Sequence, residues 1–227
     1  MQMNITWFGH ANFMIKNDDI TILIDPFFEG NPVVEADYNT LDKVDIVLLT
    51  HDHGDHVGQA LEICTAHNAE LVTVFDTANK LIAQGLNPEL AVGMNVGGTV
   101  ELKNVKIKMV QAVHSTESGI AAGFIITFPD ETTLYHAGDT ALFSDMQLFP
   151  LFHDITLSML PIGGWFTMGP KQAAYACKFL KTPKVIPMHW KTFPLLEQNT
   201  QKFQNALDEH SPNTELITLQ PGESYSL

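Results

Sequence analysis

Short apolar runs alternate with polar turns along most of the chain. Near the N-terminus, apolar runs at residues 5–9, 11–16 and 20–25 predict three strands, the last two joined by an Asn-Asp-Asp hairpin turn. Residues 45–50 form a continuous apolar run, which is typical of a strand buried on both faces. Further strands are expected at residues 71–75, 105–113, 154–164, 184–190 and 215–219, with a hairpin over 123–139.

Helices are expected between these strands, over about residues 57–67, 77–85, 170–180 and 199–210. Pro170 suits the first turn of its helix, where a missing N–H group costs nothing. The two halves share a plan of hairpins followed by a buried strand and a helix, which hints at a duplicated core. The interleaved helices predict an α/β fold with helices covering the sheets, and no linker divides residues 1–227, so one domain is expected.

Composition narrows the classes of partner. The chain has 45% apolar residues, a formal charge of −14 and no arginine, which argues against nucleic acid as a ligand. It has no apolar run of about 18 residues, which argues against a membrane span. The N-terminus lacks a basic region followed by an apolar run, so we expect a cytoplasmic protein. A small-molecule substrate fits this composition, and the oligomeric state, including a homo-oligomer, stays open.

Both cysteines are expected to be reduced residues of the core. Cys64 and Cys177 each fall on the apolar face of a predicted helix, among alanine, valine and leucine side chains. A free cysteine in such a place behaves as a small apolar side chain. Neither cysteine is therefore expected to form a disulfide or bind a metal.

The densest chemistry lies in the stretch LLTHDHGDHVG, directly after the buried strand. It holds His51, His53, Asp55 and His56 within six residues. Neutral imidazoles and a carboxylate suit Zn²⁺ or a similar divalent ion. The alternative is that Asp55 only caps the next helix and the histidines are solvated, but three histidines and two aspartates together after a buried strand favour ligands.

Further candidate ligands stand where later apolar runs end. His114 follows QAV, Asp139 follows YHAG and His189 follows IPM. Each alone could be a satisfied polar group at a strand end. Their recurrence in order after the histidine cluster favours a role as ligands, and the absence of nearby cysteine favours a catalytic over a structural site.

The order of these motifs resembles the metallo-β-lactamase fold superfamily. The resemblance rests on Asp25 after ITILI, on THDHGDH, on His114, on Gly138-Asp139-Thr140 and on Met188-His189. More narrowly, WFGHANF, HAGDT, PIGGWFTMGP and PMHW resemble the compact metal-dependent hydrolases related to ascorbate-6-phosphate lactonases. The resemblance covers nearly the whole chain and implies a four-layer αββα sandwich with the site at one edge.

The resemblance also implies an assignment of the residues to two divalent ions, with Zn²⁺ favoured and Mn²⁺, Fe²⁺ or Ni²⁺ as alternatives. His51, His53 and His114 would hold the first ion, Asp55, His56 and His189 the second, and Asp139 would bridge both. Asp25 would tie the ligand loop and orient a histidine.

We therefore expect a metal-dependent hydrolase that uses a metal-activated hydroxide on a small, anionic ester, lactone or phosphodiester. The alternative is an iron-dependent enzyme of oxygen or sulfur redox chemistry. Di-iron redox members of this fold carry glutamate as the second residue of the ligand motif, where this chain has His53. Mononuclear sulfur dioxygenases leave the second site incomplete, whereas this chain has its three residues.

Two further catalytic roles are expected. Asp55 would orient the nucleophile besides binding an ion. His10, in WFGHANF, would donate to a substrate oxyanion or move a proton, and its alternative is a turn histidine without a catalytic role. Lys171 and Lys191 are candidate anion contacts, although surface lysine is the default. The aromatic side chains Trp165, Phe166 and Trp190 either wall the pocket or pack in the core.

Overall fold

The apolar runs form two mixed sheets of seven strands each within residues 2–227, which the computed structural model describes. The chain divides into two compact units by its internal contacts. The first unit comprises residues 2–98, 115–121 and 219–227, and the second comprises residues 99–114 and 122–218. Each unit contains one of the two sheets, and three separate segments of the chain form the first unit.

The first unit has the strand order β14-β1-β2-β3-β4-β5-β6. Its strands are β1 (Asn4–Gly9), β2 (Asn12–Lys16), β3 (Thr21–Ile24), β4 (Ile46–Leu48), β5 (Glu70–Val74), β6 (Ala91–Met94) and β14 (Ser224–Ser226). The pairings from β14 to β3 are antiparallel and those from β3 to β6 are parallel. As the apolar run at 45–50 predicts, all three residues of β4 are fully buried.

Helices α1 (Gly54–Val57), α2 (Ala60–His67) and α3 (Phe75–Ala83) belong to the first unit. Ala60 and Ile63 of α2 pack in one core cluster with Val47 of β4 and Leu71 of β5. Helix α2 ends at Asn68, whose left-handed conformation (φ 53°) closes the helix as a C-cap. The apolar face of α2 thus holds the loop between β4 and α2 against the sheet.

The second unit has the strand order β13-β12-β11-β10-β9-β8-β7. Its strands are β7 (Thr99–Leu102), β8 (Val105–Gln111), β9 (Ala122–Thr127), β10 (Thr133–His136), β11 (Leu157–Pro161), β12 (Lys184–Met188) and β13 (Glu215–Leu216). The pairings from β7 to β10 are antiparallel and those from β10 to β13 are parallel, the same plan as in the first unit. The hint of duplication in the sequence is therefore confirmed at the level of the two sheets.

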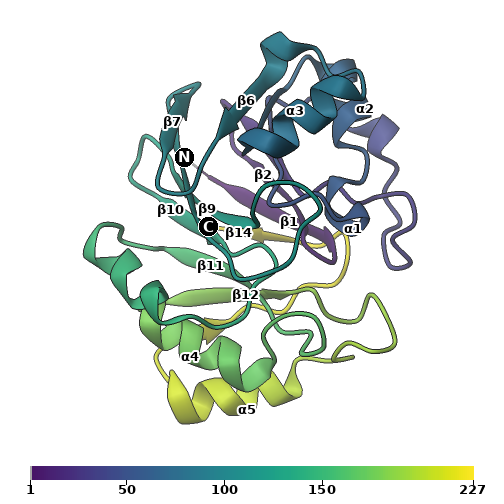
Figure 1. Cartoon of the computed structure of the whole chain (residues 1–227). Helices are drawn as coiled ribbons and strands as arrows, with labels where there is room; N and C mark the ends of the chain where they lie inside the picture. The colour runs from purple at the N-terminus through teal and green to yellow at the C-terminus, as the bar shows by residue number, and fades with distance from the viewer. Residues whose placement is uncertain (1) are drawn as a thin grey trace. The chain divides into compact units, whose positions relative to one another are not determined.

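Helices α4 (Pro170–Leu180) and α5 (Gln201–His210) belong to the second unit and contact each other (Figure 1). Helix α4 also contacts β11, and it begins at Pro170 as the sequence predicts. Three short 3-10 helices complete the elements, namely η1 (Tyr38–Thr40), η2 (Pro88–Leu90) and η3 (Ser144–Leu151). No helix in residues 2–227 has the length and apolar character needed to cross a membrane.

Three predicted helices differ from the structure, and the one expected over 199–210 differs only at its start, because α5 begins at Gln201. The helix expected over 57–67 is split into α1 and α2 at Gly58, which has φ 43°. A Cβ atom on Gly58 would lie 2.1 Å from the carbonyl oxygen of Pro26, so the close approach of these two backbones requires glycine. The helix expected over 77–85 begins two residues earlier, at Phe75.

The cysteines are as expected. Cys64 and Cys177 are free and fully buried. Burial raises the pKa of the Cys64 thiol to about 12 and also raises the pKa of Cys177. Both thiols are therefore apolar core groups rather than nucleophiles.

Candidate metal centre

In the first unit, three polar residues directly follow strands that run in one direction. β1, β3 and β4 are mutually parallel in direction, since β2 is antiparallel to both β1 and β3. His10 follows β1, Asp25 follows β3 and His51 follows β4 after a short extension. Their positions are therefore at the same edge of the first sheet, although 41 residues separate His10 from His51.

Asp25 ties the histidine loop to this edge. Its Oδ1 atom accepts a hydrogen bond from the Thr50 backbone N–H at 2.8 Å, and its Oδ2 atom accepts one from the Thr50 hydroxyl at 2.7 Å. Oδ2 also lies 2.7 Å from Nδ1 of His56, and both side chains are fully buried. When Nδ1 of His56 donates to this carboxylate, its Nε2 atom carries no proton and is suited to bind a metal ion.

The histidine rings of the loop lie together. Nε2 of His51 and Nδ1 of His53 are 3.0 Å apart, and the rings of His51 and His56 have centroids 4.1 Å apart. Two ligand atoms on a tetrahedral Zn²⁺ ion lie about 3.3 Å apart, because each bond is about 2.0–2.1 Å long. The nitrogen pair of His51 and His53 therefore fits a shared ion, and Nδ1 of His51 lies 3.0 Å from the Thr50 hydroxyl on the other side of the ring.

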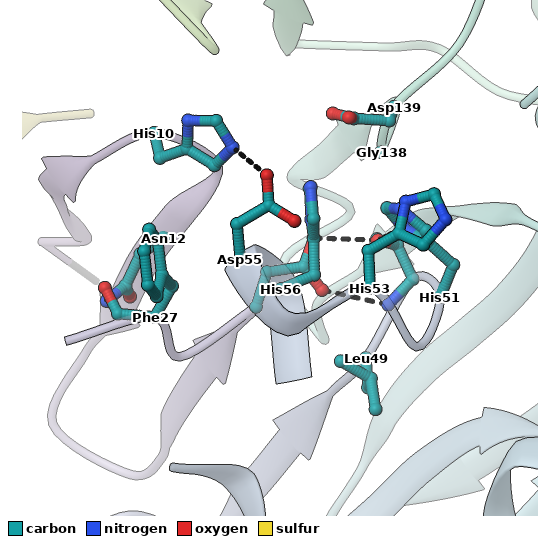
Figure 2. Close-up of polar contacts among 12 residues, drawn as sticks. His10, Asn12, Phe27, Leu49, His51, His53, Asp55, His56, Gly138 and Asp139 are labelled. Atoms are coloured by element: carbon teal, nitrogen blue, oxygen red, sulfur yellow. Dashed lines mark hydrogen bonds and ion pairs between the residues drawn. The ribbon is translucent and has the colours of Figure 1, made fainter. Parts of the chain in front are cut away.

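Asp55 and His10 are in direct contact. Nε2 of His10 lies 3.1 Å from Oδ2 of Asp55, and Figure 2 shows this contact with His51, His53 and His56 grouped beside it. His10 is fully buried, whereas a third of the Asp55 side chain (33%) is exposed. The ligand atoms of His10, Asp55 and His56 all lie within 4.8 Å of one another, so an ion or a polar substrate group at Asp55 would be close to His10.

His10 and Asp25 both adopt left-handed backbone conformations, with φ values of 56° and 46°. Such values are uncommon outside glycine and cluster at functional sites. His189 of the second unit has the same conformation, with φ 55°. In all three cases the residue comes directly after a strand. The left-handed turn ends the alternation of side chains between the two faces of the sheet, so this side chain takes a different direction.

In the second unit, three predicted ligands follow strands β8, β10 and β12. These three strands run in one direction, because β9 is antiparallel to both β8 and β10 while β10, β11 and β12 are parallel. Oδ2 of Asp139 lies 2.9 Å from Nε2 of His189 and 3.6 Å from Nε2 of His114. One carboxylate oxygen is therefore close to two imidazoles, as the predicted bridging role of Asp139 requires.

The position of His189 depends on a glycine of the neighbouring strand's loop. A Cβ atom on Gly163 would lie 2.3 Å from the carbonyl oxygen of His189 and 3.1 Å from its Nδ1 atom. Any side chain at Gly163 would displace His189. His136, also in this unit, is buried at the end of β10, and its Nδ1 atom accepts from the Gly138 backbone N–H at 3.2 Å. It thus holds the turn that leads to Asp139.

The remaining candidates divide between surface and core. Trp165 and Phe166 are 65% and 53% exposed, whereas Trp190 is buried and donates from Nε1 to the Pro187 carbonyl oxygen at 3.0 Å. Trp190 is therefore a core residue, and the other two aromatic side chains are available to a ligand. Lys191 is partly buried, and Lys171 is exposed at the start of α4.

Sequence reasoning missed Asp52, which is 5% exposed between His51 and His53. Burial raises the pKa of Asp52, but hydrogen bonds from Lys80, Ser118, Thr116 and Glu117 outweigh it and hold the pKa well below its usual value. The same contact with Asp52 raises the pKa of Lys80. The only signal in the sequence was a second aspartate inside the ligand motif, and its partners lie more than 25 residues away.

Comparison with known proteins agrees with this geometry. The β-lactamase superfamily domain matches residues 21–190, which include all seven expected metal ligands and part of each unit. That match defines the class of protein as a β-lactamase-superfamily metallo-hydrolase.

Related sequences define the family more closely. A UPF0173 metal-dependent hydrolase of Nitratidesulfovibrio vulgaris is 52% identical over 230 residues, covering 100% of this chain and 96% of that protein. A UPF0173 metal-dependent hydrolase of Lawsonia intracellularis is 48% identical and is covered completely. The chain therefore belongs to the UPF0173 metal-dependent hydrolases of the β-lactamase superfamily, and it is a metal-dependent hydrolase.

Solved structures confirm the fold class. Igni18, a metallo hydrolase from the archaeon Ignicoccus hospitalis, has a TM-score of 0.90 and 34% identity, and covers 100% of this chain and 99% of its own. An isothiocyanate hydrolase from Delia radicum gut bacteria has a TM-score of 0.79 at 20% identity and 99% coverage of both chains, and shares the fold. The expected metallo-β-lactamase α/β fold is thus confirmed.

Proposed function

We propose that this metal-dependent hydrolase cleaves a small anionic ester, lactone or phosphodiester at a centre of two divalent ions. The observation that carries the proposal is the cluster formed by the fully buried Asp25, His51 and His56 with the partly buried His53. Buried imidazole and carboxylate groups are costly unless they are paired or bind a metal ion. Here Nδ1 of His56 pairs with Asp25, and Nε2 of His51 lies 3.0 Å from Nδ1 of His53, a spacing that fits two ligand atoms of one ion.

The donor set fits zinc. All the candidate ligands are imidazole nitrogens or carboxylate oxygens, and both cysteines are buried thiols of the core. We propose that the ligands of both units serve one centre, within a single domain. His51, His53 and His114 would hold the first ion, Asp55, His56 and His189 the second, and Asp139 both. The family match, which spans residues from both units, supports this assignment.

When bound, two divalent ions lower the pKa of a shared water and polarise the oxygen of a substrate carbonyl or phosphoryl group. The side chains would supply the rest of the chemistry. Asp55 would accept a hydrogen bond from the attacking water and so fix its direction. His10, 3.1 Å from Asp55, would donate to this carboxylate and carry a proton to the leaving group.

The charge of the site favours an anionic substrate. Two divalent ions exceed the charge of Asp55 and Asp139, so the centre stays positive although the chain carries a formal charge of −14. Without arginine, a bidentate guanidinium clamp is unavailable, and the substrate's charge would rest on the ions or on Lys191. The resemblance to the lactonase branch supports a lactone or ester, and relatives named metal-dependent hydrolases favour hydrolysis over redox chemistry.

The test combines metal content with a substrate panel. Protein purified without chelators is analysed for its elements, and turnover is measured on lactones, carboxylic esters and phosphodiesters that carry a negative charge. We expect two ions per chain, dropping towards one in His56→Ala or His189→Ala while the protein stays folded. One ion per wild-type chain at saturating metal would disprove the dinuclear centre, and no turnover across the panel would disprove the substrate class.

A further inference from the structure

The segment at residues 115–121 has an unusual place in the chain. It directly follows His114, which belongs to the second unit, yet its own contacts place it in the first unit. The chain then returns to the second unit at Ala122, where β9 begins. Because this segment is joined covalently to His114, any group that fixes the segment also limits where His114 can lie.

Asp52 is the group that fixes it. Oδ1 of Asp52 accepts hydrogen bonds from the Thr116 hydroxyl at 2.5 Å, the Glu117 backbone N–H at 2.8 Å and the Ser118 backbone N–H at 3.2 Å. Oδ2 accepts from the Ser118 hydroxyl at 2.6 Å and from the Lys80 ammonium at 2.8 Å. Two oxygens of one buried carboxylate thus receive five donors, four of them from three consecutive residues of the segment.

Contacts other than those with Asp52 hold the segment against α3. The hydroxyls of Thr77 and Ser118 lie 3.1 Å apart. Gly119 has φ 66°, and a Cβ atom there would lie 2.7 Å from Cγ1 of Val74. The Lys80 ammonium, which pairs with Asp52, also pairs with Glu117 at 2.8 Å. These contacts show a fitted position rather than a loose surface loop.

The position of Asp52 within the ligand motif explains why the fixed position of the segment at residues 115–121 matters. Along an extended chain neighbouring side chains point to opposite sides, so Asp52 points away from the side shared by His51 and His53. It cannot join them as a ligand. Asp52 is one residue from each of these histidines, and Thr116 is two residues from His114. Consecutive Cα atoms are about 3.8 Å apart, so this hydrogen bond limits how far His114 can move from the histidine pair.

We propose that Asp52 is a positioning residue that sets His114 against His51 and His53 by fastening the segment at residues 115–121. This inference rests on the proposed function, because it assumes that the three histidines hold one ion. Asp52 itself touches neither the ion nor the substrate. Its effect is to pre-organise a ligand set whose members come from distant parts of the chain.

The test measures metal binding in the full-length protein. Zn²⁺ affinity is determined by competition with a chromophoric chelator, and the geometry of the site is read from the absorption spectrum after loading with Co²⁺. We expect Asp52→Ala to weaken binding of the first ion by about 10–100-fold, the usual effect of losing a group that supports a metal ligand. Asp52→Asn should recover part of the loss, because its amide oxygen can still accept from the segment.

Asp45→Ala is the matched control. Asp45 is also a buried carboxylate of the first unit, and it accepts from the Thr21 backbone N–H at 2.9 Å and pairs with Lys43 at 2.6 Å. It lies before β4, whereas Asp52 lies after that strand. We expect Asp45→Ala to lower stability without changing Zn²⁺ affinity or the Co²⁺ spectrum. An equal loss of affinity in both variants would overturn the positioning role.

Two further readouts complete the test. Thr116→Val removes one bond from the segment side, and it should weaken Zn²⁺ binding less than Asp52→Ala but in the same direction; this variant and Asp52→Asn decide the question if Asp52→Ala does not fold. In metal-free protein, a protease specific for glutamate should cut after Glu117 faster in Asp52→Asn than in wild type. Wild-type Zn²⁺ affinity and spectrum in all Asp52 variants would overturn the inference while leaving the proposed function intact. A wild type that binds no Zn²⁺ would overturn the proposed function, and the cleavage rates would still show whether Asp52 fastens the segment.

Discussion

β4 and β11 occupy equivalent places in their sheets, each being the second strand of the parallel half, yet the loops after them carry different chemistry. The loop after β4 holds three histidines and two aspartates, whereas the loop after β11 reads Ile-Gly-Gly-Trp-Phe. The first unit thus concentrates its candidate ligands in one loop. In the second unit one candidate ligand follows each of β8, β10 and β12, and a glycine of the β11 loop makes room for His189.

Neighbouring strands show the same contrast. β3 and β10 are also equivalent, and each is followed by an aspartate of the candidate centre, Asp25 and Asp139. Asp25 supports the histidine loop through hydrogen bonds with Thr50 and His56, whereas Asp139 contacts the candidate ligands His114 and His189. In the first unit the aspartate supports a dense loop, whereas in the second unit the aspartate is itself a candidate ligand.

The comparison teaches that the same strand plan can supply metal ligands in two ways. A dense loop needs supporting hydrogen bonds, because several imidazoles must be oriented at once. Isolated ligands at the ends of parallel strands are oriented by the sheet itself. Substitutions should therefore have different consequences in the two units, and this difference can be measured.

The largest expected effect distinguishes the roles of two candidate ligand carboxylates, Asp55 and Asp139. Asp55→Asn should lower kcat by about 10³-fold, within the range for lost acid–base help, while the first ion stays bound. The amide keeps the shape but is a poorer acceptor for water and a poorer ligand. Asp139→Asn should instead lower the metal content, since Asp139 contacts both candidate ligand histidines of its unit, His114 and His189. Elemental analysis and kinetics of both variants check this contrast, and full activity of Asp55→Asn would remove Asp55 from the mechanism.

Gly58 and Gly163, at which an added Cβ would lie closest to a neighbouring backbone oxygen, give the next largest effect. Gly58→Ala combines a left-handed φ of 43° with a Cβ atom 2.1 Å from backbone, so it should lower the free energy of unfolding by about 3 kcal/mol. Gly163→Ala should also destabilise the protein, but by displacing His189 it should weaken binding of one ion as well. Chemical denaturation and Zn²⁺ titration compare them, with Gly54→Ala as control because a Cβ there meets nothing within 4 Å. Equal metal affinity in Gly163→Ala and wild type would contradict the role of Gly163.

Much of the fold could be predicted from the sequence because the buried strands are continuous apolar runs. The run at 45–50 contains β4, and the helix predicted over 170–180 has the observed bounds of α4. β6, β7 and β14 were not predicted. β6 contains a glycine, and β7 alternates exposed and partly buried residues beside a glycine-rich turn, so both depend on pairing with a neighbour.

The candidate site was predictable where ligands are close in sequence and hidden where tertiary contacts decide. His51 and His53 stand out because polar residues rarely crowd after a buried strand. The hydrogen bond between Asp52 and Thr116 joins positions 64 residues apart, and neither residue type indicates in the sequence that the other is its partner. The turn residue His10 was a candidate, but its partner Asp55 became visible only when β1 and β4 were placed in one sheet.

His10→Ala should lower kcat by about 10²-fold, the lower limit for lost acid–base help, and leave two ions bound. Its contact with Asp55 at 3.1 Å belongs wholly to the first unit, so the second unit's ligands should be unaffected. His10→Gln should recover part of the activity if donation of a hydrogen bond, rather than proton transfer, is the role. The kcat and metal content of both variants are measured together. Unchanged activity would make His10 only a turn residue, and loss of an ion would make it a ligand.

The smallest expected effect concerns Asp25. This aspartate supports the histidine loop of the first unit, whereas the equivalent aspartate of the second unit, Asp139, is a candidate ligand. Asp25 has φ 46°, and asparagine tolerates left-handed backbone well, so Asp25→Asn should keep the turn and change only the side-chain bonds. Its amide nitrogen would donate to Nδ1 of His56, and the imidazole proton would move to Nε2, the nitrogen expected to bind the ion.

We therefore expect Asp25→Asn to weaken the second ion by about tenfold or more while the first ion binds as in wild type. Zn²⁺ competition measures the affinities, and nitrogen chemical shifts of the metal-free protein report which nitrogen of His56 carries the proton. Asp25→Asn with unchanged affinity and an unchanged His56 tautomer would show that the loop orients its histidines without this aspartate. The dense loop of the first unit would then need no supporting aspartate, like the candidate ligands at the strand ends of the second unit.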